Sequence, residues 1–197
     1  MISSQFTELL LQSLEHERGG VLVYQTAIKC AVRDDLRSEW QKYLAQTEEH
    51  VDSLTNICET FDIDPFTTTP GTQIVKSLGK SLVMAMEAAL SAGNPQAAQI
   101  VAAECVVLAE TKDHLDWELI GEAAKALSGE EQEVVSDAYE KIEEEEDEHL
   151  YHTQGWCREL WLESLGLEAQ LPPPEEIEDV TSAVEAQEAK ENRQARH

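Results

Sequence analysis

Three short stretches of the sequence combine carboxylates with a histidine at spacings that place them on one side of a helix. Glu146 and His149 form a Glu-x-x-His pair, Glu110 precedes His114 by four residues, and His50 follows two glutamates. Side chains three or four residues apart share a helix face. Carboxylate oxygens and imidazole nitrogens suit Fe(II), Mn(II) and Zn(II). The pattern predicts a metal site, provided that the stretches lie on helices that meet.

The distribution of proline predicts where those helices lie. Residues 1–64 and 96–171 contain no proline, the residue least compatible with a helix interior. No stretch alternates polar and apolar residues with the period of two that is typical of strands. We expect helices over residues 3–32, 35–61, 73–92, 96–126 and 130–165. Two long hairpins joined by a connection that carries an extra helix make an all-α four-helix bundle with a crossover.

Three consecutive prolines, Pro172 to Pro174, mark the expected edge of the packed domain. We expect a helical bundle over residues 1–166 and a proline-rich, then acidic tail over 167–197, flexible or wrapped on a partner. Within the bundle, Ser128 followed by Glu131 is typical of a capping box at the start of the last long helix.

Helical wheels place several polar side chains on the inward faces of these helices. Glu17 and Tyr24 lie two turns apart on the inward face of the first helix, and His50 lies on that of the second. In the last long helix, Glu146 and His149 share the inward face. The 96–126 helix is apolar on most sides, so its helical wheel does not clearly identify which side chains face inward. Inward carboxylates without an inward Arg or Lys imply raised pKa values or a bound cation.

Distances from the hairpin turns predict which of these side chains lie level. Glu17 and His50 are almost equidistant from a turn near residue 34, and Glu110 and Glu146 from a turn near residue 128. Antiparallel packing brings each pair level, but spacing leaves open whether the two hairpins share one height. At ~1.5 Å per residue, Glu104 lies about nine ångströms from Glu110 along the axis, which makes these two residues alternatives for one metal.

With these residues in place, the chain resembles the ferritin-like di-iron carboxylate superfamily, which includes bacterioferritins and rubrerythrins, over about residues 3–165. In that superfamily two helices each offer a glutamate and two each offer Glu-x-x-His. Glu146 and His149 match the last motif fully, whereas Thr47 stands where the second helix should carry a glutamate. The metal ligands that the resemblance implies are Glu17, His50, Glu110, His114, Glu146 and His149, with Glu48, Glu104 and Glu145 as alternates.

The resemblance implies one or two bound iron ions, with manganese or zinc as alternatives, and an oxidoreductase that acts on dioxygen or peroxide. Tyr24 is then similar to the family's tyrosine near the first glutamate, as a redox-active or hydrogen-bonding neighbour. Thr47 weakens the site and favours a second hypothesis, a non-catalytic structural or partner-binding module with a degenerate metal site. A third hypothesis is a subunit of an iron-storage cage.

The composition limits the kinds of molecule that the chain is expected to bind. Forty Asp and Glu oppose fourteen Lys and Arg, for a net charge of −26. Such a chain repels phosphate backbones and anionic membrane surfaces, so we expect neither nucleic acid nor membrane binding. The N-terminal residues lack the pattern of a signal peptide, and the four cysteines are widely spaced. We therefore expect a cytoplasmic protein with reduced thiols that forms a homo-oligomer, with a dimer favoured.

Overall fold

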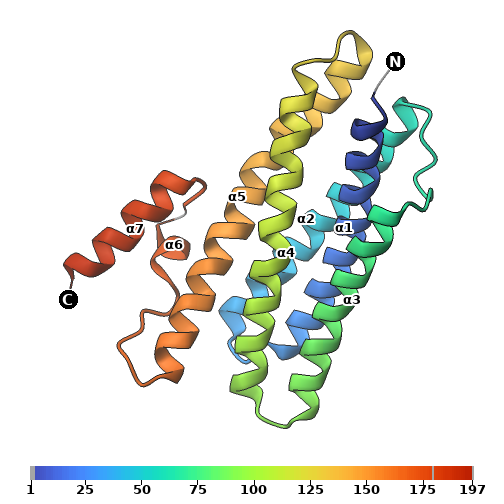
Figure 1. The fold of residues 1–197 in the computed structure, drawn as a ribbon. Coiled ribbons are helices and arrows are strands. Elements are labelled where there is room, and N and C mark those ends of the chain that lie inside the picture. Colours follow the sequence, from blue (N-terminus) through green and yellow to red (C-terminus); the bar gives the residue numbers. More distant parts are fainter. Residues whose placement is uncertain (1–2, 179, 197) are drawn as a thin grey trace.

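The computed structural model describes residues 3–178 and 180–196, which form seven α-helices and no strand (Figure 1). Their bounds are α1 Ser4–Cys30, α2 Asp34–Thr60, α3 Pro70–Ser91, α4 Pro95–Ala124, α5 Glu130–Ser164, α6 Pro174–Ile177 and α7 Ala183–Ala195. The all-α prediction is confirmed for the described residues. Each of the five helices expected from the sequence is present, with both ends within three residues of the predicted positions.

Local sequence signals explain where several helices begin. The Ser3 side chain caps α1 by accepting from the backbone N–H of Phe6, and the Asn94 side chain caps α4 in the same way. Thr69 and Thr72 form a reciprocal capping box at α3. Such caps satisfy amide groups that have no partner inside the helix.

The start of α5 differs from the prediction. Gly129 is the N-cap residue, with φ 67°, and no side chain caps the helix. The predicted capping box at Ser128 is wrong, because the chain enters α5 through a left-handed conformation that glycine adopts at little cost.

Four of the helices form a closed ring. Within it α1 packs on α2, α2 on α5, α5 on α4, and α4 on α1. The connection over residues 61–69 and α3 carries the chain from one hairpin to the other, and α3 lies outside the ring against α1 and α4 (Figure 1). Gly19 and Gly79 allow the close approach of α1 and α3, since a Cβ on Gly79 would lie 3.6 Å from the Gly19 Cα. The finer assignment to a ferritin-like bundle stays a prediction.

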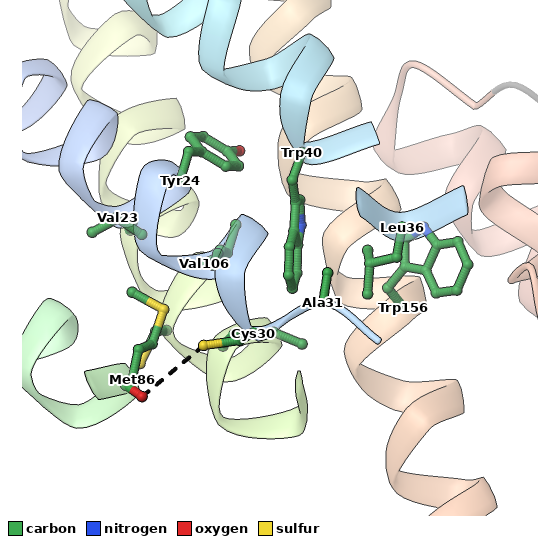
Figure 2. Close-up of a cluster of buried hydrophobic side chains, with 14 of the residues drawn as sticks. Val23, Tyr24, Cys30, Ala31, Leu36, Trp40, Met86, Val106 and Trp156 are labelled. Atoms are coloured by element: carbon green, nitrogen blue, oxygen red, sulfur yellow. Dashed lines mark hydrogen bonds between the residues drawn. The ribbon is translucent and has the colours of Figure 1, made fainter. Parts of the chain in front are cut away.

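Two apolar clusters fill the ring. The first contains Tyr24, Tyr43 and Trp156, and Figure 2 shows part of it, including the contact between the Cys30 thiol and the Met86 carbonyl. The second cluster surrounds Trp117. Tyr43 and Trp117 also contact the polar side chains described below, which therefore lie between two dry regions.

The described residues after 166 pack on the bundle. We expected this segment to be flexible or wrapped on a partner, but α6 and α7 both contact α5. Arg158 of α5 forms a bidentate ion pair with the fully buried Glu175, at 2.6 and 2.8 Å. Val180, Ala186 and Ala189 form a small apolar cluster against Tyr151. The physical reason is that the few small apolar groups of the segment, together with this ion pair, find a complementary face on α5.

The cysteines are free, three of them buried and Cys157 half-buried. Among the helices of the described residues, none has both the length and the apolar character needed to cross a bilayer.

Candidate metal centre

Carboxylates and imidazoles from all four helices of the ring meet in its middle. Glu17 comes from α1, His50 from α2, Glu110 from α4, and Glu146 and His149 from α5. Each of these residues is at most 2% exposed. Burying charged groups is costly unless something compensates them, and the described Lys and Arg side chains form none of the close contacts in this group.

The ligand atoms form two groups that share one carboxylate. Nδ1 of His50 lies 3.4 Å from Oε1 of Glu17 and 3.0 Å from Oε1 of Glu146. Nδ1 of His149 lies 3.4 Å from Oε2 of Glu110 and 3.5 Å from the same Oε1 of Glu146. Within each group of three residues, the ligand atoms lie within 4.8 Å of one another. Glu146 is therefore placed to contact ions in both groups.

Six buried side-chain atoms of these five residues lack hydrogen bonds. They are Nδ1 of His50, Nδ1 of His149, both side-chain oxygens of Glu146, and Oε2 of Glu17 and of Glu110. The short contacts above bring four of them close without the alignment of a hydrogen bond: both Nδ1 atoms, Oε1 of Glu146 and Oε2 of Glu110. An unsatisfied buried polar group costs about 1–3 kcal/mol, so six such atoms on five neighbouring residues fit a cation better than an apolar core.

The outer atoms of the same side chains are bonded. Nε2 of His50 donates to Oε2 of Glu145 at 2.8 Å, and Nε2 of His149 donates to Oε1 of Gln46 at 3.0 Å. These bonds favour the tautomer whose Nδ1 lone pair points into the centre. Metal-binding histidines characteristically donate their other ring N–H to a carboxylate or carbonyl oxygen, which fixes the ring.

The carboxylates give the centre a negative potential that favours positive charge. Burial would lower the pKa of His50, but the Glu17 charge and the nearby carboxylates of Glu145 and Glu146 raise it to about 12. Burial would also lower the pKa of His149, but its contacts with the carboxylates of Glu110 and Glu146 raise it to about 9. Burial would raise the pKa of Glu146, yet its contacts with the two imidazoles lower it to about 2. Without a metal, protonated histidines thus supply the charge that the carboxylates require.

Sequence reasoning missed a further buried acid, Asp113. It lies on α4 one turn from Glu110, is 3% exposed, and has an unpartnered Oδ1. Burial and the charges of Glu17, Glu146 and Glu110 raise its pKa well above the usual value. The signal was the spacing of three residues from Glu110.

Two neighbours of the ligands were also missed. Trp117 donates from Nε1 to Oε1 of Glu17 at 2.8 Å, and Gln46 holds His149 as described above. Both contacts join different helices, so no spacing within one helix could reveal them.

Several residues expected at the centre lie elsewhere. His114 is at the side of α4, where its Nε2 pairs with Asp147 at 2.6 Å. Glu104 is exposed and accepts from Trp161, and Glu48 is exposed on α2. The reason is angular: the core face of α4 runs through Glu110 and Asp113, which turns His114 toward α5 and Glu104 toward solvent.

The second helix offers one ligand to the centre rather than two. Thr47 is buried, but its hydroxyl donates to the Tyr43 carbonyl and its methyl group faces Gly20. Glu48 does not replace the missing glutamate, and Glu145 contacts His50 from the outer side. Glu146 is therefore the one carboxylate that both groups share.

Tyr24 lies beside the centre, as expected. It is fully buried, its hydroxyl has no hydrogen-bond partner, and its ring centroid is 6.1 Å from that of His149. Burial and then the Glu110 charge raise the pKa of Tyr24 well above its usual value, so the phenol stays protonated at neutral pH.

A further cluster, formed by Glu39, His152 and Glu176, lies near the C-terminal segment. The Tyr43 hydroxyl lies 3.0 Å from Nδ1 of His152, and Nε2 donates to the Val180 carbonyl at 2.7 Å. Both ring nitrogens already have partners, so this cluster is a tether between α5 and the C-terminal segment.

Comparison of the chain with protein-family models, with curated proteins and with solved structures finds no match.

Proposed function

We propose that this chain binds two divalent metal ions inside the bundle, with iron as the leading candidate and manganese or zinc as alternatives. Glu17, His50 and Glu146 would hold one ion, and Glu110, Glu146 and His149 would hold the other. The observation that carries the proposal is the convergence of two unpartnered Nδ1 atoms on one unpartnered carboxylate. The donor set of oxygen and imidazole nitrogen suits these metals.

Charge supports two ions rather than one. The four buried carboxylates, which are the three glutamates and Asp113, carry four negative charges when ionised. Two divalent ions with neutral histidines balance that charge. Each group supplies three protein side chains, as in catalytic metal sites that keep a position open for a small molecule.

We infer that the centre is an oxidoreductase site acting on dioxygen or peroxide. Bound in its reduced form, iron would supply the electrons for that reaction. The two apolar clusters cover the two ends of the centre, and the His50 and His149 rings are held by their outer hydrogen bonds. The Tyr24 hydroxyl is free to donate a hydrogen bond toward the centre.

Metal content tests the binding site directly. The chain is stripped with a chelator, reconstituted with Fe(II) without oxygen, desalted and measured by ICP-MS. We expect about two ions per chain, and a strong loss in Glu146→Gln, because that substitution removes the shared ligand. Glu49→Gln is the matched control, since Glu49 is exposed on α2 and pairs with Lys141. Near-zero metal in the unaltered chain, or an equal loss in the control, would overturn the proposal.

Oxidation kinetics test the redox role. We expect the reconstituted chain to oxidise Fe(II) faster than buffer on mixing with oxygen. Tyr24→Phe should slow that oxidation while the metal content stays unchanged. If the protein matches buffer while retaining both ions, the centre binds metal without this activity.

A second candidate function, self-association, is favoured by the outer face of α3. Ile74, Leu78 and Met84 are 62%, 55% and 67% exposed there. The sequence of α3 carries one acid and two lysines, in a chain whose net charge is −26. Mutual repulsion between copies is therefore weak across this face. Light scattering tests the proposal: a dimer that Ile74→Glu converts to a monomer supports it, and a dimer that persists in this variant contradicts it.

A further inference from the structure

A cavity of about 260 Å³ lies between α4 and α5, and the buried metal centre forms part of its wall. Its lining includes Trp117 and Glu146 at the centre, and Tyr139 and Tyr151 nearer the surface. Glu146 is 1% exposed and both its carboxylate oxygens lack hydrogen-bond partners. The cavity therefore borders the one residue that both ligand groups share.

The outer part of the cavity is acidic on both sides. Glu118 and Glu122 lie one turn apart on α4, and Glu143 and Asp147 lie one turn apart on α5. Glu118, Glu122 and Glu143 are exposed, and the described lining contains no Lys or Arg. Clefts lined by charge of one sign concentrate counter-ions and speed their association.

His114 lies in the same wall. Its Nε2 pairs with Oδ1 of Asp147 at 2.6 Å, and its side chain is 28% exposed. This residue, which the sequence pattern placed at the buried centre, is one of the groups that a cation would meet on the way to Glu146.

Apolar packing covers the two ends of the centre. The apolar cluster around Tyr43 covers one end, and the cluster around Trp117 covers the other. The larger cavity between α1 and α3 is lined by Arg18, Lys76 and Lys80 and includes none of the ligands. Among the described cavities, the one between α4 and α5 combines negative charge with a buried, unpartnered ligand.

We propose that this cavity is the loading site of the metal centre, in which divalent cations bind transiently to Glu118, Glu122 and Glu143 before they reach Glu146. The inference rests on the proposed metal centre and adds its access route. Cations keep their water molecules at the exposed carboxylates and exchange them for the buried ligands further in. Removing the outer carboxylates should slow loading without changing the amount of metal bound.

The test follows Co(II) uptake by the metal-free full chain in a stopped-flow spectrophotometer. The probe is cobalt chloride, whose visible absorption changes when imidazole and carboxylate replace water. The variant combines Glu118→Gln, Glu122→Gln and Glu143→Gln, and the control combines Asp52→Asn, Glu59→Gln and Glu87→Gln. Both sets alter exposed acids and change the net charge equally.

We expect the initial uptake rate to fall about tenfold in the cavity variant, with the final absorbance unchanged, and the control rate to stay near that of the unaltered chain. High salt should lower the rate of Co(II) uptake by the unaltered chain and reduce its difference from the cavity variant, because ions screen exposed charges. Equal rates in all three proteins, with cobalt bound in each, would overturn the loading site and leave the metal centre standing. Absence of cobalt binding by the unaltered chain would overturn both.

Discussion

Replacing Asp113 with asparagine should stabilise the metal-free chain. This side chain is 3% exposed, has an unpartnered Oδ1, and lies near three other buried carboxylates. Asparagine has nearly the same shape and no charge. Removing one uncompensated buried charge is worth about 1–3 kcal/mol. In a chain of this size each kcal/mol shifts Tm by about 2–4 °C, so Tm should rise by about 2–12 °C.

The pH dependence of the gain follows from the direction of the pKa shift. Burial and the neighbouring carboxylates raise the pKa of Asp113 above its unfolded value. The stability that its proton contributes is therefore fully present below the unfolded pKa of 3.8 and is lost as pH rises through the folded pKa. Asparagine cannot lose that proton. The difference in Tm between the variant and the unaltered chain should therefore grow as pH rises.

Thermal unfolding with a chelator present, measured from pH 4.5 to 8.5, provides the assay. Asp116→Asn is the matched control, because Asp116 lies on the same helix and is 6% exposed but pairs with Lys112. We expect no stabilisation in that control. Saturating Mn(II) should reduce the rise in Tm that Asp113→Asn produces, since a bound cation offsets the carboxylate charge. A variant that is less stable at pH 8, or a gain independent of pH, would refute the reasoning.

Two further predictions concern contacts between helices. Gln46→Met removes the acceptor that orients His149 and should lower metal affinity by about 10–100-fold, as measured by Co(II) titration; unchanged affinity would contradict this. Arg158→Met leaves the buried Glu175 without its partner, a cost of about 3–5 kcal/mol. Hydrogen exchange in α7 should then accelerate while the bundle stays protected, whereas Arg196→Met, at a 64% exposed side chain, should have no effect. Equal protection of α7 in both arginine variants would show that this ion pair does not hold the segment.

The helices were readable from the sequence because their signals are local. Proline positions and the apolar stripes located all five long helices. The predicted pairing of Glu17 with His50 is confirmed, since antiparallel hairpins bring equidistant residues level. The C-terminal segment was less readable, because its helices are held by contacts with α5, such as that between Arg158 and Glu175, which join residues far apart in sequence.

On α4 the sequence was a poorer guide to the site. When a helix is apolar on most sides, a helical wheel does not identify its inward face. For this reason His114 was expected inside and Asp113 was overlooked. The inward face of such a helix depends on how its neighbours pack around it.

The amino-acid sequence by itself determined which side chains could meet within each hairpin, because helix periodicity and distance from a turn are properties of the local chain. Only the tertiary structure decided that both hairpins place them at one height, with Nδ1 of His50 from α2 3.0 Å from Glu146 of α5. That register comes from the packing of α1 on α4 and of α2 on α5. It depends on side-chain shapes along two separate interfaces, which no spacing within a single helix encodes.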